Sequence, residues 1–270
     1  MESYNSKIQI VGLESTNNNL LNESNKSTFD KSYFGEDRRY TAENTTYFLP
    51  NDDKEHNRLH LQHNILKFIW QGNFFAPVEH LLNQEETKVL DVGAGSWLLD
   101  MATNYPKAKF TGLDISPAQP VPAKKWQSVI NELVRILKPG GYLEWLDLDF
   151  QYKTMGPVKT KIINAIVTMS HERGLDPDLC YKLQGFLEEH NQLHNIHCEI
   201  KEKFNGDEKF CKLWIENYSA VLMGMKSNLM NILKVSSDEY DDLVKTVGKE
   251  LTEFEAYYPH VRVYAQKKLA

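Results

Sequence analysis

Short apolar runs alternate with amphipathic stretches through the middle of the chain. Residues 88–92 form an apolar run that breaks at a Gly-x-Gly turn, and residues 109–114 form a second run that ends in an acid. Between residues 126 and 137 the apolar positions recur at helical spacing, Lys138-Pro-Gly-Gly141 predicts a stop, and residues 142–147 form the next apolar run. This alternation predicts an α/β fold with a mostly parallel sheet.

The C-terminal half favours helices and two late strands. Residues 158–172 carry isoleucine, valine and methionine at helical spacing, and a second helix is expected over residues 177–189. Residues 197–204 and 260–266 alternate between apolar and polar positions and predict antiparallel edge strands. Further helices are expected between residues 208 and 258.

The N-terminal part has a different composition. Residues 1–31 are rich in Asn and Ser and hold few large apolar side chains, so burial cannot repay the entropy lost on ordering them. We therefore expect a disordered tail there. Asp52-Asp-Lys-Glu55 is typical of a capping box and predicts a helix that runs to about Gly72.

Length and composition predict one folded domain. A chain of 270 residues with 41% hydrophobic content can bury one sizeable core, which we expect over residues 32–270. Within it, residues 32–84 are expected to form a helical N-terminal cap and residues 85–150 a ligand-binding core. Residues 151–270 are expected to hold the C-terminal helices and the last strands.

The turn after the first apolar run is the candidate ligand site. Gly93 and Gly95 let the backbone approach a ligand where any Cβ would collide, and the helix that follows offers free N–H groups. Asp114 lies 19 positions after Gly95, the spacing at which an acid accepts hydrogen bonds from ribose hydroxyls in nucleotide-binding folds. Gly-x-Gly alone is often only a tight turn, so the joint spacing carries the prediction.

With these residues the chain resembles the class I S-adenosylmethionine-dependent methyltransferases. Three segments are similar to their first motif, their ribose-binding turn and the turn before their fifth strand: Val89–Gly95, Gly112–Ser116 and Leu137–Glu144. A further segment is similar to the N-terminal cap of a fungal-type branch of that superfamily: Tyr47 to Asp52, followed by Glu55, Arg58 and His63. The resemblance covers residues 30–268.

The resemblance implies a Rossmann-like, mostly parallel sheet with an antiparallel C-terminal strand, and S-adenosyl-L-methionine as the cofactor. It implies methyl transfer to a small-molecule or protein acceptor that the sequence does not identify. Such chemistry depends mainly on positioning, so no catalytic residue is assigned. The residues expected to bind the cofactor are Asp91, Gly93, Ala94, Gly95, Asp114, Ile115, Tyr47 and Arg58.

One interval departs from the pattern of the superfamily. Only 12 positions separate Asp114 from Trp126, where relatives hold two strands with their helices, and a strand–helix–strand unit needs about thirty residues. Residues 116–122 contain three prolines and are expected to be an extended link. The sheet should then have about five strands instead of seven, and the strand at residues 88–92 should pair directly with the one at Tyr142.

This shortening leaves three interpretations open. The chain is an active methyltransferase, or a truncated, catalytically impaired paralogue that acts as a non-catalytic interaction protein. A mis-spliced gene model would give the same sequence.

Net charge and composition limit the classes of binding partner and the cellular location that the sequence predicts. The net charge of −6 gives no electrostatic footprint for nucleic acid. The sequence has no signal-peptide pattern and no run of about eighteen apolar residues, so we expect no membrane insertion and a location in the cytoplasm or nucleus. Three widely spaced cysteines suit a reducing compartment. His56, His60 and His63 share one helix face, but no Cys or acid partner is evident and no metal is expected.

Overall fold

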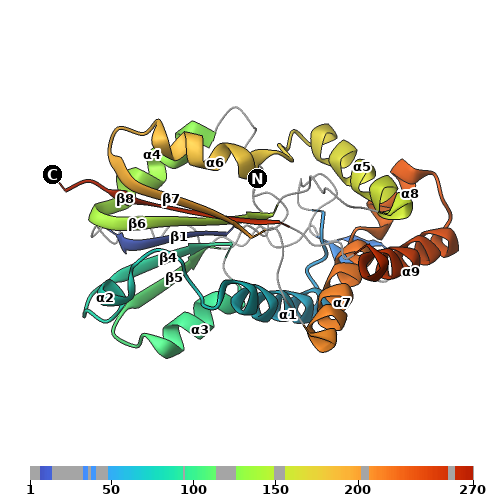
Figure 1. The fold of residues 1–270 in the computed structure, drawn as a ribbon, viewed down its shortest axis with the longest axis horizontal. Helices are drawn as coiled ribbons and strands as arrows, with labels where there is room; N and C mark the ends of the chain where they lie inside the picture. The colour runs from blue at the N-terminus through green and yellow to red at the C-terminus, as the bar shows by residue number, and fades with distance from the viewer. Residues whose placement is uncertain are drawn as a thin grey trace.

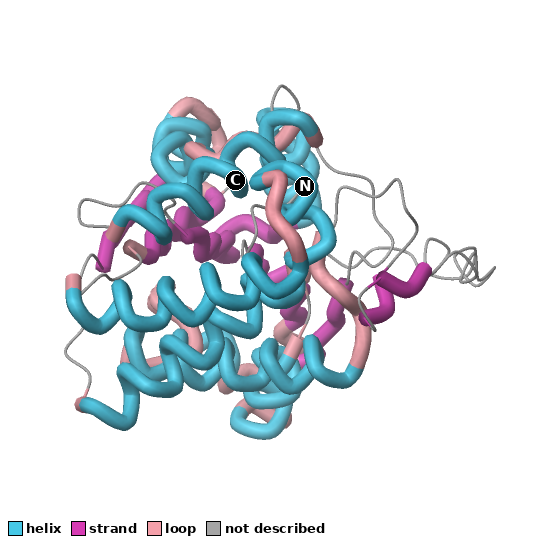
Figure 2. The backbone as a smooth tube through the Cα atoms, turned by 90° about the vertical axis from the view of Figure 1, so that its right-hand side faces the viewer, coloured by secondary structure: helices cyan, strands magenta, loops and turns pink. Residues whose placement is uncertain are grey.

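The computed structural model describes most of the chain. The described residues are 7–13, 33–35, 38–40, 48–93, 95–113, 126–148, 156–201, 207–254 and 259–269. They form a central sheet with helices on both faces and a layer of further helices at one end (Figure 1). Figure 2 views the molecule from that end, where the helices lie in front of the strands.

The strands are β1 (Lys7–Leu13), β2 (Tyr33–Gly35), β3 (Arg38–Tyr40), β4 (Lys88–Val92), β5 (Lys109–Leu113), β6 (Leu137–Leu148), β7 (Leu193–Lys201) and β8 (His260–Lys267). The helices are α1 (Asp53–Trp70), α2 (Glu79–Leu82), α3 (Ser96–Asn104), α4 (Trp126–Ile136), α5 (Pro157–Glu172), α6 (Leu179–Glu188), α7 (Glu208–Gly224), α8 (Lys226–Leu233) and α9 (Ser237–Glu253). None of these described helices combines the length and the apolar composition that crossing a membrane requires.

The main sheet has six strands in the order β5-β4-β1-β6-β8-β7. The strands β4, β5, β6 and β7 run in one direction, and β1 and β8 run in the other. The predicted α/β class, with a mostly common strand direction and an antiparallel C-terminal strand, is therefore confirmed. The carboxyl ends of β4, β5 and β6 consequently lie at one edge of the sheet, where ligands of such folds bind.

The strand β1 is the main departure from the sequence-based expectation, since it lies within the segment predicted to be a disordered tail. It is inserted between β4 and β6 and pairs antiparallel with both. The sheet therefore has one strand more than the five expected, and β4 does not pair directly with β6. The short interval after Asp114 predicts the order β5-β4-β6-β8-β7 for the five expected strands, and apart from the insertion of β1 this order is present.

Burial explains why so short a segment is ordered. Ile8 and Ile10 are 3% and 0% exposed and pack with Leu143 and Trp145 of β6 and with α4. Val11 is buried in a separate cluster with Tyr142. Because β1 gains hydrogen bonds from two neighbouring strands as well as this burial, the entropy of ordering it is offset. The composition of residues 1–31 gave no sign of this strand, because only a few of its positions needed to be apolar.

Most helices begin and end close to the predicted positions. Asp52 caps α1, and its carboxylate accepts a hydrogen bond from the Glu55 N–H at 3.0 Å. The Glu55 side chain pairs with Arg58 instead of completing a reciprocal capping box. The late strands are present as β7 and β8. The prediction of an edge strand is confirmed for β7 and wrong for β8, because β8 pairs with both β6 and β7. The strand β6 begins at Leu137, before the position expected from the Pro-Gly-Gly sequence. The cap, core and C-terminal boundaries drawn at residues 84 and 150 remain predictions.

Candidate functional site

The glycine turn lies at the carboxyl ends of two parallel strands. Gly93 follows β4 with φ +83°, a left-handed conformation that favours glycine. Its N–H donates to the carbonyl of Leu113, the last residue of β5, at 2.8 Å. This bond extends the β4–β5 pairing by one residue and holds the turn against the edge of the sheet.

Gly95 has free space beside it. It is the N-cap residue of α3, and a Cβ placed on it would meet no atom of the described residues within 4 Å. The amino end of a helix offers unpaired N–H groups and a partial positive charge. The turn therefore has the room and the donors that the carboxylate end of a nucleotide-like ligand requires.

Asp91 is fully buried at the end of β4. In the sheet it lies opposite Gln9 of β1, and Gln9 lies opposite Glu144 of β6. Residues directly opposite one another share a face, so these three side chains form a polar row across the face that α1 and α3 cover. Asp91 comes just before the glycine turn, as the sequence predicted, whereas Gln9 and Glu144 were not foreseen.

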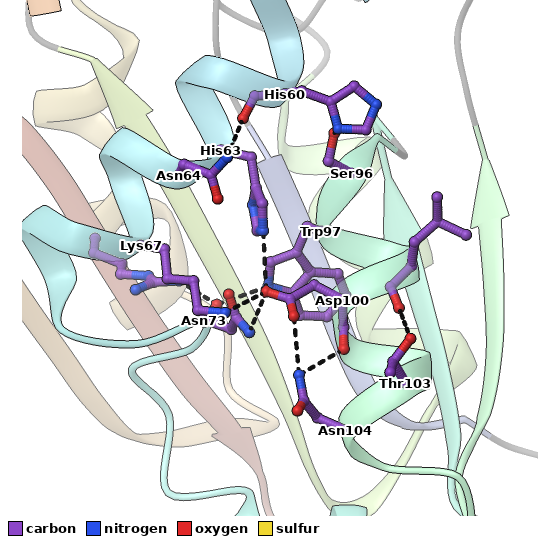
Figure 3. Close-up of polar contacts among 12 residues, drawn as sticks. His60, His63, Asn64, Lys67, Asn73, Ser96, Trp97, Asp100, Thr103 and Asn104 are labelled. Carbon is purple, nitrogen blue, oxygen red and sulfur yellow. Dashed lines mark hydrogen bonds and ion pairs between the residues drawn. The ribbon is translucent and has the colours of Figure 1, made fainter. Parts of the chain in front are cut away.

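Histidines of α1 face the start of α3 (Figure 3). His60 Nδ1 lies 2.7 Å from the hydroxyl of Ser96, the first residue of α3, and its Nε2 lies 2.9 Å from Nε2 of His56. One turn along, His63 Nε2 lies 3.2 Å from the Asp100 carboxylate. These contacts join the cap helix to the helix that follows the glycine turn. No group of His, Cys, Asp and Glu suited to a metal ion occurs in the described part of the chain.

Asp100 is the centre of this contact. Lys67 Nζ and Asn73 Nδ2 donate to its Oδ2 at 2.6 and 3.0 Å (Figure 3). Partial burial raises the pKa of Asp100, but the hydrogen bonds from Lys67, Asn73 and His63 outweigh it and hold the pKa at about 2. Asp100 is therefore ionised at neutral pH and anchors α3 to α1.

Arg58 lies on the opposite side of α1 from the glycine turn. It is two positions before His60, which is about 200° around the helix axis. Its guanidinium pairs with Glu55 at 2.7 Å and donates to the side-chain oxygens of Gln62 and Asn217. The structure thus places Arg58 between α1 and α7 and does not bring it to Gly93 and Gly95.

The other predicted cofactor residues cannot be placed. Tyr47, Ala94, Asp114 and Ile115 lie outside the described residues.

Glu144, the third residue of the polar row, belongs to a buried ion pair. Arg262 of β8 pairs with Glu144 at 2.6 Å, and both side chains are 4% exposed. The other Glu144 oxygen accepts from the N–H groups of Phe75 and Ala76 at 2.8 and 2.7 Å, and Arg262 donates to the carbonyl of Asn73. The pair fixes the segment after α1 on the sheet. In the sequence, the only sign of this ion pair is that Glu144 interrupts the apolar run 142–147.

Comparison of the sequence with known proteins finds fungal relatives. The chain is 28% identical to methyltransferase str3 of Strobilurus tenacellus over 204 residues, which are 60% of this chain and 71% of that protein. It is 25% identical over 142 residues to the secondary metabolism regulator laeA of Monascus pilosus, or 39% of this chain and 38% of that protein. The chain is thus similar in sequence to a fungal methyltransferase and to a fungal regulator of secondary metabolism. Its match spans well under half of the laeA protein.

Two further comparisons add no detail. No protein-family model matches the sequence. An N-methyltransferase of Haemonchus contortus, solved with S-adenosylhomocysteine, superposes with a TM-score of 0.39 at 13% identity, over 82% of this chain and 62% of that one.

Proposed function

We propose that this methyltransferase relative binds S-adenosyl-L-methionine at the turn between β4 and α3 and transfers its methyl group to an acceptor. The open space beside Gly95, at the amino end of α3 and next to the left-handed Gly93, carries the proposal. The relationship to methyltransferase str3 supports the same activity.

The chain's own residues would bind the cofactor and orient it. When bound, the cofactor supplies a methyl group carried on a cationic sulfur; a lone pair of the acceptor bonds to that methyl group, S-adenosylhomocysteine is the leaving group, and the acceptor loses its proton. The backbone from Gly93 to Gly95 and the first N–H groups of α3 would hold the amino-acid end, and Asp91 would orient the turn. Asp114 and Ile115 would hold the ribose. No general base is assigned.

A second candidate is a non-catalytic interaction protein, and β1 favours it. Between β4 and β6 the sheet holds an antiparallel strand from the N-terminal segment, so β1 ends at the opposite edge from the carboxyl ends of β4 and β6. A truncated paralogue would use such a strand to close its sheet without keeping a cofactor site.

Calorimetric titration with S-adenosylhomocysteine separates the two. The test variant is Gly95→Val, whose Cβ would enter the space beside the turn without meeting a described atom within 4 Å. The matched control is Gly185→Val on the exposed face of α6, where a Cβ also meets nothing within 4 Å. We expect wild type and the control to bind alike and Gly95→Val to lose about tenfold or more in affinity, the equivalent of one lost hydrogen bond to a charged group. A wild-type chain that does not bind would support the interaction protein.

A further inference from the structure

Two cavities lie end to end along the contact between α1 and α7. The outer one is open and has a volume of about 360 Å³, which lies within the range of roughly 300–1,000 Å³ for ligand pockets. It is lined by Lys54, Glu55 and Arg58 from the first turns of α1 and by residues near the end of α7. The inner one is lined by Gln62 and Leu66, further along α1, and by residues nearer the start of α7. The two helices thus form a continuous wall.

The outer cavity is cationic. Its lining includes four basic side chains, Arg38, Lys54, Arg58 and Lys226, and one carboxylate, Glu55. Glu55 pairs with Arg58.

Two further carboxylates contact these cations from outside the lining. Asp52 accepts from Arg38 at 2.6 Å and Asp241 from Lys226 at 2.6 Å. Lys54 is exposed and has no carboxylate partner among the described residues. The charge facing the cavity therefore favours an anion.

The inner cavity is small and mostly apolar. It has a volume of about 30 Å³, enough for about two water molecules or a short alkyl end. It lies at the carboxyl end of β6, where its lining includes Asp147, His260, Leu66, Ile163, Ile166 and Val221. Asp147 and His260 are 0% and 1% exposed, so two buried polar groups adjoin an apolar space.

A polar junction lies between the two cavities. The guanidinium of Arg58, which lines the outer cavity, donates to Gln62 and Asn217, which line the inner one. The Arg58 side chain is 3% exposed. The junction lies on the far side of α1 from the glycine turn, so the two cavities and the proposed cofactor turn occupy different faces of that helix.

We propose that the contact between α1 and α7 binds a small amphipathic organic acid. Its acidic group lies among the cations of the outer cavity, and its apolar end passes the Arg58 junction toward Asp147 at the carboxyl edge of the sheet. This site is separate from the proposed cofactor turn, and the inference does not depend on the proposed methyl transfer. Both a carboxylate and a phosphate ester have the required chemistry.

NMR titration of the full chain with matched eight-carbon probes tests the inference. Octanoate and octyl phosphate carry the acid, 1-octanol is the neutral analogue and octylammonium carries the opposite charge. We expect the two acids to bind at least about fivefold more tightly than the other two, as one favourable ion pair would give. Their relative affinities identify the preferred acidic group. Contacts from the terminal methyl of the probe to Ile166 and Val221 should locate the apolar end.

Charge reversal provides the matched variants. Lys54→Glu removes a cation from the outer cavity at the second residue of α1, where an acid suits the helix dipole. Lys209→Glu makes the same change at the second residue of α7, which also follows an aspartate cap and lies outside both linings. We expect Lys54→Glu to lower octanoate affinity about fivefold and to leave 1-octanol unchanged, and Lys209→Glu to change neither.

The results that would overturn the inference are distinct from a failure of the proposed function. Equal binding of octanoate and 1-octanol, an equal loss in both variants, or probe contacts away from Ile166 and Val221 would each overturn it. Binding of S-adenosylhomocysteine without binding of any acid would keep the methyltransferase and overturn the pocket. Binding of octanoate between α1 and α7 without binding of S-adenosylhomocysteine would keep the pocket and overturn the proposed function.

Discussion

His60 Nδ1 and the hydroxyl of Ser96 lie 2.7 Å apart, and this contact ties the cap helix α1 to the first residue after the glycine turn. His60 lies on α1 and Ser96 begins α3, so the contact couples the packing of α1 to the shape of the proposed cofactor turn. Its consequences can be measured without any knowledge of the acceptor.

We expect Ser96→Ala and His60→Ala each to lower the free energy of unfolding by about 1 kcal/mol, since a part-buried hydrogen bond contributes about that much. The double variant should lose less than the sum of the two, because both changes remove the same bond. Urea unfolding at pH 7.5 measures all three. Full additivity would show that the two groups do not interact in solution.

Lowering the pH should remove the contribution of Asp100 to the free energy of unfolding. Its pKa is held at about 2, below the ordinary value of 3.8, so the folded state binds its proton less readily than the unfolded state. The stabilisation is complete above pH 3.8 and is lost as the pH falls through about 2. With the solvent exposure of this carboxylate taken into account, it amounts to about 1–2 kcal/mol.

Asp100→Asn checks this sign. At pH 7 the variant should be less stable than wild type, and the difference should shrink between pH 4 and pH 2 as wild type also loses its charge. The control is Asp242→Asn on α9, where the hydrogen bond from Lys245 also lowers the pKa of the carboxyl but the pair is exposed, so its pH-dependent difference should be much smaller. A difference that stays constant with pH would contradict the assignment.

Ile10, which is 0% exposed, tests whether β1 is part of the folded sheet. Ile10→Ala should lower the free energy of unfolding by about 2–4 kcal/mol, because it removes buried methyl groups and leaves a cavity. Ile200→Ala in β7, where the side chain is 46% exposed, is the matched control and should cost less than about 1 kcal/mol. If Ile10→Ala has no effect, the N-terminal segment is a disordered tail.

The pair of Glu144 and Arg262 should be costly to break. Arg262→Met leaves the Glu144 carboxylate buried without its cation and should lower stability by about 3 kcal/mol or more. Adding Glu144→Gln should recover part of that loss, because the uncompensated charge is gone. Thermal unfolding of the two variants measures it, and a double variant no more stable than Arg262→Met would show that the charge itself is unimportant.

Asp114 tests the proposed ribose contact. Asp114→Ala should weaken S-adenosylhomocysteine binding about tenfold to a hundredfold, since two hydrogen bonds to a charged group are lost. Calorimetry of wild type and variant measures the change. An unchanged dissociation constant would remove Asp114 from the site.

The sequence alone determined the features that depend on neighbours along the chain. The cap at Asp52, the helix over residues 157–172, the turn at Gly93 and the alternating strands β7 and β8 all follow from local spacing and from residue-specific backbone preferences. The strand order on either side of β1 followed from the short interval after Asp114, which left no room for two further strands.

Only the tertiary structure decided which distant segments meet. The pairing of Ile8 with Val92 and Trp145 spans more than eighty residues, and nothing within residues 1–31 signals the two strand edges that bury it. In the same way, the direction of Arg58 toward α7 and of His60 toward Ser96 depends on which helix packs on each side of α1. Periodicity marks that a helix has faces, but the partner of each face is set by long-range packing.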